Sequence, residues 1–584
     1  MGSPNDHQPD HIMRIRSSLL VLVLAACTIR PEPQARQQGS AQQYDVVITN
    51  GRIVDGTGNP WFYGDVAISG DRIARIAPAG TLAESGARQK IDANGLVVAP
   101  GVIDIQAQSY TELLSGDSRV ISMITQGVTT MILGEGDTPA PANEKIFQSA
   151  AAIAMDTALQ RELRGFTGPR GFDSWLRAME KHTTSVNVGS FVGAGTVRAY
   201  AKGMAEGPAT AAELDTMRRV VRDAMFDGAF GVGSALIYPP GNYASTAELI
   251  EEAKAMSPLG GIYITHMRSE GDRLVEAVDE AIRIGKEGGV PVEIYHLKAA
   301  GVRNWPKAAQ VVAKIDSARA AGQDVATDQY PYVAGQNNLS SCIPPWAHAD
   351  GKLIAHLRDA ATRAKIKAEM TSEHAGFESL CMAATPAGVE VVGFTVDSLK
   401  KYEGKRLPEI ARALHKDWPD ALMDLTIAEQ NKLGQVIFVA SDSNVAMQVR
   451  KPWMKFGTDA EAFDPDSAKI ATHPRAYGTY PRILGRFVRE QRILTLEDAV
   501  RKMSGAVAER LSIRDRGELR EGMYADVMLF DPKTIIDKAT YEKPHQLSVG
   551  VQYVFVNGVP VVSVGKVTGA KPGKIVRGPA WRGE

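Results

Sequence analysis

Four short apolar runs of this 584-residue chain each end in a side chain that can bind a metal ion or transfer a proton. A strand buried in a parallel sheet reads as such a run, and parallel barrels place their reactive groups where the strands end. We therefore expect the four side chains to converge on one rim. They are Glu135, His266, His296 and Asp442.

Three of these residues suit one divalent metal ion. The imidazoles of His266 and His296 and the carboxylate of Glu135 are good ligands for zinc, and a catalytic zinc uses about three protein ligands and an open position for water. The metal lowers the pKa of that water to roughly 7 and polarises a carbonyl group. Asp442 can take a proton from the water and pass it to a leaving nitrogen. The pattern predicts metal-assisted hydrolysis.

The elements that must position these residues alternate between apolar runs and helical stretches such as 245–256 and 273–286. Eight such runs predict an α/β chain whose residues 99–514 form a (β/α)₈ barrel, with a doubly wound open sheet as the alternative. The expected strands span 97–105, 129–133, 186–192, 231–234, 261–265, 290–295, 324–327 and 435–440. The longest interval, between the last two strands, predicts an insertion at 340–430.

The two ends of the chain share another pattern. Short strands separated by Gly and Asp turns occupy residues 44–98, and similar strands return in 515–584, where Asn557-Gly558 is a hairpin signal. We expect the two ends to form one flanking β-sandwich.

The N-terminus predicts export. Arg14 and Arg16 precede an apolar run too short to span a bilayer, and small residues lead to Cys27. Leu-Ala-Ala-Cys resembles the bacterial lipobox, so residues 1–27 are expected to be a lipoprotein-type signal and 28–43 a flexible tether. The alternative is an ordinary cleaved signal. The expected location is a periplasm-facing outer-membrane lipoprotein or the cell envelope, with membrane contact only through the lipid.

Composition excludes some classes of function. The formal net charge of −1 gives no reason to expect a nucleic-acid partner. The three cysteines show no CxxC spacing, which disfavours a thiolate zinc cluster. Cys342 and Cys381 can pair in an oxidising compartment, although two separate buried thiols are the favoured interpretation.

Ordered motifs over residues 44–584 resemble the amidohydrolase superfamily, and within it the N-acyl-D-amino-acid deacylases, or D-aminoacylases. The matching segments are 44–48, 99–104, 126–130, 228–231, 238–241, 263–268, 296–298, 328–332, 441–442, 473–478 and 522–529. The resemblance implies a zinc held by His266 and His296, with Glu135 at the place of a third ligand that is often cysteine. It also implies that Asp442 is the catalytic acid and base.

The resemblance further implies a site for the α-carboxylate of the substrate. Lys298, Tyr330 and Arg475 match the residues that hold this group, and Tyr238 matches another tyrosine of the pocket. A carboxylate favours arginine and lysine donors in a partly dry pocket. The alternative for Arg475 and Lys298 is a structural ion pair.

The chain departs from the family where a second metal would bind. The family usually has His-x-His after the first barrel strand, whereas this chain has Gln106-Ala107-Gln108. Glutamine is a poor ligand, so Gln106 and Gln108 are expected to mark a vestigial second site beside one divalent metal, zinc being favoured. A histidine of the family is also missing from Gly193-Ala194-Gly195, which affects substrate preference.

The predicted function is hydrolysis of the amide of small-molecule N-acyl amino acids, of D configuration by resemblance, or of a peptide-like amide with a free carboxylate. A second interpretation keeps the enzyme but changes the substrate to another amide, a carbamate, a cyclic amide, an ester or a dipeptide, since fold does not fix function. A third is a non-catalytic binding lipoprotein on a decayed barrel, suggested by the lost His-x-His.

Overall fold

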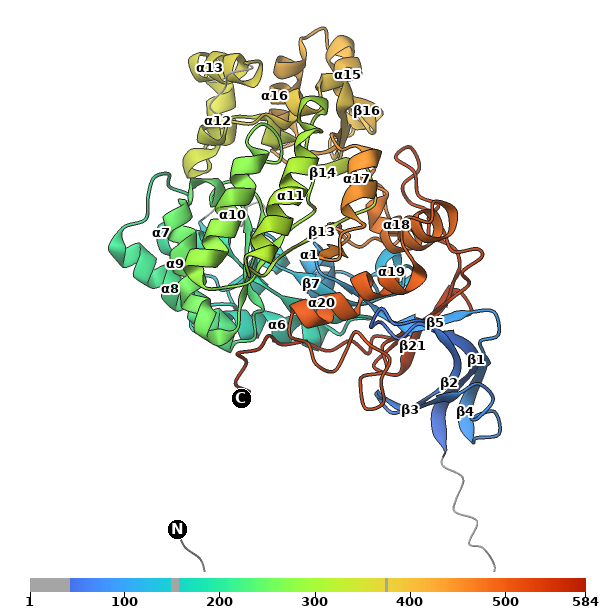
Figure 1. The fold of residues 1–584 in the computed structure, drawn as a ribbon. Helices are drawn as coiled ribbons and strands as arrows, with labels where there is room; N and C mark the ends of the chain where they lie inside the picture. Colours follow the sequence, from blue (N-terminus) through green and yellow to red (C-terminus); the bar gives the residue numbers. More distant parts are fainter. Residues whose placement is uncertain (1–42, 149–156, 373–376, 584) are drawn as a thin grey trace, which may run out of the picture. The chain divides into compact units, whose positions relative to one another are not determined.

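The computed structural model describes residues 43–148, 157–372 and 377–583, and its centre is a barrel of eight parallel strands with helices outside (Figure 1). The strands, in order around the barrel, are β6 (Val102–Asp104), β7 (Val128–Leu133), β8 with β9 (Asn187–Ser190 and Val192–Gly193), β10 (Gly231–Ala235), β11 (Ile262–His266), β12 (Val292–Ile294), β13 (Val325–Gln329) and β18 (Met454–Phe456). The predicted (β/α)₈ barrel is confirmed.

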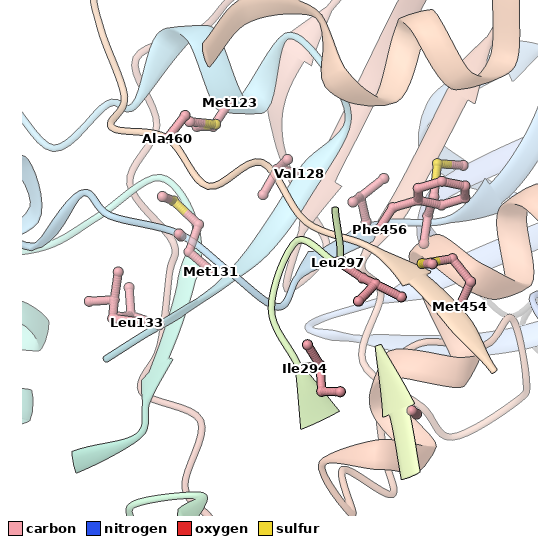
Figure 2. Close-up of a cluster of buried hydrophobic side chains, with 14 of the residues drawn as sticks. Met123, Val128, Met131, Leu133, Ile294, Leu297, Met454, Phe456 and Ala460 are labelled. Atoms are coloured by element: carbon pink, nitrogen blue, oxygen red, sulfur yellow. The ribbon is translucent and has the colours of Figure 1, made fainter. Parts of the chain in front are cut away.

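Helices follow the strands and cover their outer faces. The main ones are α6 (Gly171–His182), α8 (Ala211–Phe226), α9 (Thr246–Met256), α10 (Leu274–Gly288), α11 (Lys307–Ala320), α17 (Asp442–Gln448), α18 (Arg475–Arg482), α19 (Leu496–Met503) and α20 (Gly505–Arg510). Successive side chains of a strand point to opposite faces. In β7, Ile132 packs inside the barrel, while Met131 and Leu133 join the outer cluster shown in Figure 2.

The eighth barrel strand is not the one predicted. Residues 434–438 form β17, which pairs antiparallel with β14 (Ala334–Asn338) and belongs to another sheet. The eighth strand is β18, which pairs in parallel with β13. Its run of three residues is short and carries the charged Lys455, which pairs with Glu293 at 3.0 Å in the interior. The longer apolar run of β17 therefore gave the stronger signal.

Asp104 closes the barrel between its first and last strands. The carboxylate of this buried residue accepts hydrogen bonds from the backbone N–H of Thr458 at 2.9 Å and from its hydroxyl at 2.5 Å. The backbone N–H of Asp459 donates to the carbonyl of Gln106 at 2.7 Å. These bonds fix the loop after β18 against the loop after β6.

The insertion between β13 and β18 forms a small subdomain with its own apolar core, coloured yellow to orange in Figure 1. Its antiparallel sheet has the order β14-β17-β15-β16, so the insertion extends on both sides of the predicted 340–430. The further elements are β15 (Val389–Val392), β16 (Lys405–Arg406), α12 (Leu353–Arg358), α13 (Ala360–Met370), α14 (Leu380–Ala383), α15 (Leu407–Ala413) and α16 (Trp418–Ala428).

Strands from both chain ends share one nine-stranded sheet of the flanking β-sandwich. Its order is β22-β21-β20-β19-β5-β1-β2-β3, with β4 beside β1. The bounds are β1 (Tyr44–Ile53), β2 (Phe62–Ser69), β3 (Arg72–Pro78), β4 (Ala87–Asp92), β5 (Val97–Pro100), β19 (Val527–Phe530), β20 (Val551–Val556), β21 (Val559–Ser563) and β22 (Lys566–Val567). Asn557 and Gly558 have positive φ and join β20 to β21, as their hairpin signal predicts.

Two predicted boundaries of the sandwich are wrong. The predicted first barrel strand spans 97–105, but its first four residues form β5, which pairs with β1 and β19 in the sandwich sheet. At the other end, Val576 leaves the sandwich and packs into the barrel interior beside Val507 and Leu511. The last segment of the chain thus helps to close the barrel floor.

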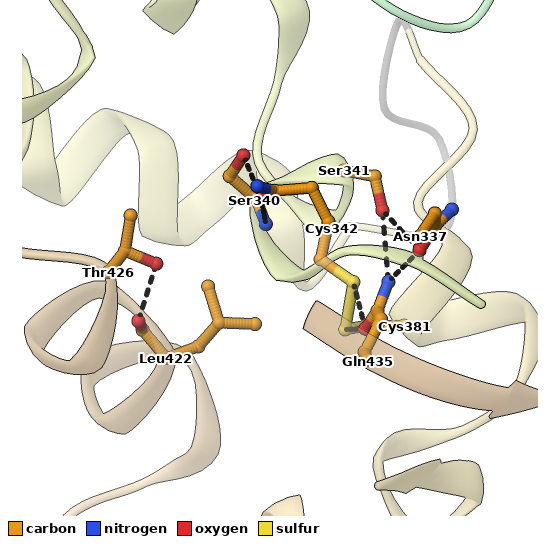
Figure 3. Close-up of a disulfide and its surroundings, with 9 residues drawn as sticks. Asn337, Ser340, Ser341, Cys342, Cys381, Leu422, Thr426 and Gln435 are labelled. Carbon is orange, nitrogen blue, oxygen red and sulfur yellow. Dashed lines mark hydrogen bonds between the residues drawn. A yellow bond between two sulfur atoms is a disulfide. The ribbon is translucent and has the colours of Figure 1, made fainter. Parts of the chain in front are cut away.

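Cys342 and Cys381 form a disulfide within the insertion (Figure 3), so the interpretation as two separate thiols is wrong. Both cysteines are fully buried in the insertion core. The bond closes a loop with a sequence separation of 39, which lowers the entropy of the unfolded chain and stabilises the fold by about 3 to 4 kcal/mol in the chain-entropy account.

Residues 1–42, with the predicted signal and Cys27, lie outside the described residues. No helix of the described part of the chain is long and apolar enough to cross a membrane.

Candidate metal centre

The structure brings Glu135, His266 and His296 together at the C-terminal ends of the barrel strands. One carboxylate oxygen of Glu135, Oε1, lies 3.1 Å from Nδ1 of His266 and 3.3 Å from Nε2 of His296. The three ligand atoms all lie within 4.8 Å of one another. The two imidazoles are almost completely buried, and the side chain of Glu135 is 8% exposed.

Local backbone geometry sets each of these positions. Glu135 follows Gly134, whose φ of +106° and contact with the carbonyl of Phe191 exclude a side chain there. His296 itself has φ of +33°, a conformation uncommon for residues other than glycine. Its backbone N–H donates to the buried carboxylate of Asp328 at 2.8 Å, which holds the histidine in this position.

Gln106 and Gln108 hold the other oxygen of Glu135. Their side-chain amides donate to Oε2 at 2.5 Å and 2.7 Å respectively. The residues predicted to mark a vestigial site therefore act as hydrogen-bond donors. They direct Oε1 toward the two histidines.

The charge balance keeps Glu135 ionised. Burial opposes ionisation, but His296 and His266 outweigh it and hold the pKa of Glu135 well below its usual value. An ionised carboxylate with two imidazole nitrogens is a donor set that fits zinc or a similar divalent ion. Among the described residues, these three make the one group of His, Cys, Asp and Glu side chains close enough to hold a metal.

A second layer of charge orients His296. Lys298 lies 2.6 Å from Glu270 and donates to Nδ1 of His296 at 2.9 Å. Burial acts to raise the pKa of Glu270, but Lys298 and the histidines lower it below its usual value. A partner on the nitrogen remote from the metal fixes the orientation of a ligating imidazole. The sequence analysis did not identify Glu270. Its position four residues after His266 is the signal that could have found it.

Asp459, and not the predicted Asp442, lies beside the candidate metal ligands. It follows β18, its side chain is 12% exposed, and Oδ2 lies 2.6 Å from Nη1 of Arg475 and 3.9 Å from Nε2 of His296. Gln108 donates to its other oxygen at 3.3 Å. Burial raises the pKa of Asp459 above its usual value, although Arg475 acts in the opposite direction.

Asp442 lies away from this centre, so its predicted position is wrong. It is the first residue of α17, its side chain is 69% exposed, and it lies 3.4 Å from Arg486. The error follows from the eighth strand, because Asp442 closes the β17 run rather than a barrel strand. Asp459 also follows an apolar run, that of β18, but this run is shorter and contains the charged Lys455.

The predicted residues for the substrate carboxylate line one cavity of about 480 Å³ with the metal ligands and Asp459. The guanidinium carbon of Arg475 lies 4.6 Å from the centre of the Tyr330 ring, and the amine of Lys298 lies 5.7 Å from it. Nε of Arg475 is buried and makes no hydrogen bond among the described residues, whereas Nη1 faces Asp459 and Nη2 donates to the carbonyl of Gln336 at 3.2 Å. The hydroxyl of Tyr238 accepts a hydrogen bond from the side-chain amide of Asn337 of the insertion at 3.1 Å.

The chain is similar to known proteins over most of its length. A sequence model of the amidohydrolase family matches residues 449–562. The D-aminoacylase of Alcaligenes xylosoxydans xylosoxydans is 32% identical over 540 residues, covering 92% of this chain and 99% of that protein. The N-acyl-D-glutamate deacylase of the same organism is 31% identical over 545 residues, covering 92% of this chain and 97% of that protein.

Two solved structures are similar over almost the same length. An N-acyl-D-glutamate deacylase from Bordetella bronchiseptica, complexed with zinc and a phosphonate mimic of the tetrahedral intermediate, is 29% identical with a TM-score of 0.75, covering 92% of this chain and 100% of that one. A D-aminoacylase studied for its binuclear metal centre, with one-metal activation and second-metal attenuation, is 31% identical with a TM-score of 0.75, covering 91% and 100%.

Replacing one ligand should remove the metal. His266→Ala takes away one of the two imidazoles, so the variant purified without chelators is expected to hold less than about a tenth of the wild-type metal content, by elemental analysis. Asp442→Ala is the matched control, because that side chain lies outside the centre, and it should keep the wild-type content. Unchanged metal in His266→Ala would show that the metal binds elsewhere.

Proposed function

Because the chain belongs to the D-aminoacylase family of the amidohydrolase superfamily, we propose that it hydrolyses N-acyl-D-amino acids with one zinc ion and Asp459 as acid and base. Metal-dependent hydrolysis of a carbon–nitrogen bond is the coarser activity that membership of this family supports. The observation that carries the finer proposal is one cavity that the candidate metal ligands, Asp459 and the buried Arg475 line together.

Two sets of residues have separate roles in the proposed reaction: one would bind the metal, and Asp459 transfers a proton. Glu135, His266 and His296 would hold a divalent ion, which would supply Lewis acidity toward the scissile carbonyl and the attacking water. Asp459 accepts a proton from the water as its oxygen bonds to the carbonyl carbon. The same carboxyl group then gives that proton to the nitrogen as the carbon–nitrogen bond breaks. A pKa raised by burial suits a group that must both accept and donate.

Arg475 and Lys298 would hold the α-carboxylate of the substrate. The buried guanidinium of Arg475 has one nitrogen, Nε, without a hydrogen-bond acceptor, and Tyr330 lies against its face. A substrate carboxylate would supply the missing acceptor, and charge-assisted bonds of this kind are stronger than neutral ones. Each of the two residues also has an acidic partner, as the alternative of structural ion pairs predicts. Arg475 faces Asp459, and Lys298 faces Glu270.

The glutamines support a single metal. Gln106 and Gln108 place their amides on the oxygen of Glu135 that a bridging carboxylate would give to a second ion. An amide is uncharged and a weak ligand, so nothing on this side replaces the imidazoles of a second site. We infer that Glu135 gives one oxygen to one metal.

Asp459→Asn tests the proton-transfer role. Loss of the acid and base should lower kcat for an N-acetyl-D-amino acid by about 10² to 10⁴-fold, while the metal stays bound. Asp442→Asn removes the same charge from an exposed site and should stay within about threefold of wild type. The opposite pattern, an inactive Asp442→Asn and an active Asp459→Asn, would contradict the assignment.

Arg475→Ala tests the carboxylate site through a ratio of substrates. The wild type should prefer an N-acetyl-D-amino acid over its C-terminal amide, and the variant should lose about ten- to a hundredfold of that preference in kcat/KM. The ratio isolates the clamp, because any effect through Asp459 applies to both substrates. Arg486→Ala, outside the cavity, is the control. A preference unchanged in Arg475→Ala would mean that this residue does not bind the carboxylate.

We also propose that the protein is exported and anchored through Cys27. The Cys342–Cys381 disulfide supports an oxidising compartment, since such bonds are rare in reducing ones. Cys27→Ser should move the protein from the membrane fraction to the soluble envelope fraction in its natural host, with the disulfide intact. Membrane association unchanged by Cys27→Ser would rule out the lipid anchor.

A further inference from the structure

The segment that leads into Arg475 is bound to strand β14 of the insertion. The side-chain oxygen of Gln336, in the middle of this strand, accepts a hydrogen bond from the hydroxyl of Thr472 at 3.1 Å and from the backbone N–H of His473 at 2.9 Å. Both donor residues are buried, and a buried N–H group needs an acceptor. The Gln336 side chain therefore satisfies the residues directly before Arg475.

Two further contacts join the same segment to the insertion. Nδ1 of His473 accepts from the backbone N–H of Arg475 at 2.9 Å, and Nε2 lies 3.0 Å from the carbonyl oxygen of Ala334, the first residue of β14. Burial and the nearby Arg475 hold the pKa of His473 well below its usual value, so the ring is neutral and its Nε2–H donates to Ala334. The backbone N–H of Ala471 donates to the insertion residue Glu403 at 2.9 Å.

The guanidinium group of Arg475 is held by the same strand. Its Nη2 donates to the backbone carbonyl of Gln336 at 3.2 Å, its Nη1 lies 2.6 Å from Asp459, and its Nε has no hydrogen-bond partner among the described residues. Gln336 thus binds the approach to Arg475 through its side chain and the guanidinium through its main chain. A carbonyl is neutral, so it orients the guanidinium without offsetting its charge, as a second carboxylate would.

Strand β14 also passes close to Tyr330, whose ring lies against the guanidinium. A Cβ atom at Gly335 would lie 3.3 Å from the Tyr330 hydroxyl oxygen, which is a tight contact. On its other edge the strand is fixed by antiparallel pairing with β17, in which Gln336 lies opposite Val436. One strand of the insertion therefore adjoins two of the three residues assigned to the substrate carboxylate.

We propose that Gln336 is a positioning residue for the carboxylate site and holds Arg475 in the orientation that binds the α-carboxylate of the substrate. The inference rests on the proposed function, because Arg475 is the group through which Gln336 acts. It adds a part in substrate recognition for the insertion.

Gln336→Met tests the proposal, since it keeps the length of the side chain and removes the oxygen that Thr472 and His473 use. The preference for an N-acetyl-D-amino acid over its C-terminal amide, as a ratio of kcat/KM values, should fall by about five- to twentyfold. Gln323→Met is the matched control, because Gln323 is also half-buried but precedes β13, at the end of that strand remote from the cavity. It should keep the wild-type ratio. An unchanged ratio in Gln336→Met would overturn the proposal.

A double variant shows whether the effect passes through Arg475. If it does, Gln336→Met combined with Arg475→Ala should have the ratio of Arg475→Ala alone, within about twofold. Losses that multiply would mean that Gln336 acts independently of Arg475, either on the substrate itself or through general packing, and would overturn the positioning role.

Thr472→Val is the milder test if Gln336→Met does not fold, because it removes one donor and keeps the shape of the side chain. The ratio should fall by about two- to fivefold in the wild-type background and stay unchanged in Arg475→Ala. No fall in the wild-type background would overturn the proposal.

The outcomes separate this inference from the proposed function. An acid preference that is lost in Arg475→Ala but kept in Gln336→Met would overturn the inference and leave the carboxylate site intact. If the wild type with bound zinc hydrolysed neither substrate, the proposed function would fail and the inference with it.

Discussion

Glu135 is a buried carboxylate whose two oxygens have different partners, and the geometry of the centre depends on that division. A buried charge is stable only when paired and hydrogen-bonded. Oε1 faces the two histidines, and Oε2 accepts from Gln106 and Gln108. The amides satisfy Oε2 with neutral donors and leave Oε1 directed toward the two histidines. In the proposed one-metal centre, the glutamines thus both stabilise the first site and occupy the oxygen that a second ion would need.

The loops at the barrel rim place further polar residues beside Glu135. Asp104 binds Thr458 and fixes the loop after β18, so Asp459 is held beside the metal ligands. Arg475 lies against Asp459 and against Tyr330, which joins the proposed acid and base to the proposed site for the substrate carboxylate. The insertion contributes Asn337, whose side-chain amide donates to the hydroxyl of Tyr238 in the same cavity. The lining of this cavity therefore includes an element that the barrel alone does not contain.

Much of the fold and part of the centre followed from the sequence. Glu135, His266 and His296 were predictable because each closes a clear apolar run, and such runs end at the same barrel rim. Asp459 was not, since β18 has three residues, one of them the charged Lys455, whereas β17 has the apolar run of a buried strand in a different sheet. Pairing partners decide which sheet a strand joins, and a run of residue types does not record them. The Cys342–Cys381 bond depends on the same tertiary proximity.

The central claim is that one metal, held by Glu135, His266 and His296, suffices for hydrolysis with Asp459. The most direct measurement is a titration of the metal-free enzyme with zinc, followed by the rate of amine release from an N-acetyl-D-amino acid. The account predicts a rate that rises linearly and stops rising at about one zinc per chain. A rate that needs a second equivalent of zinc to reach its maximum would contradict it.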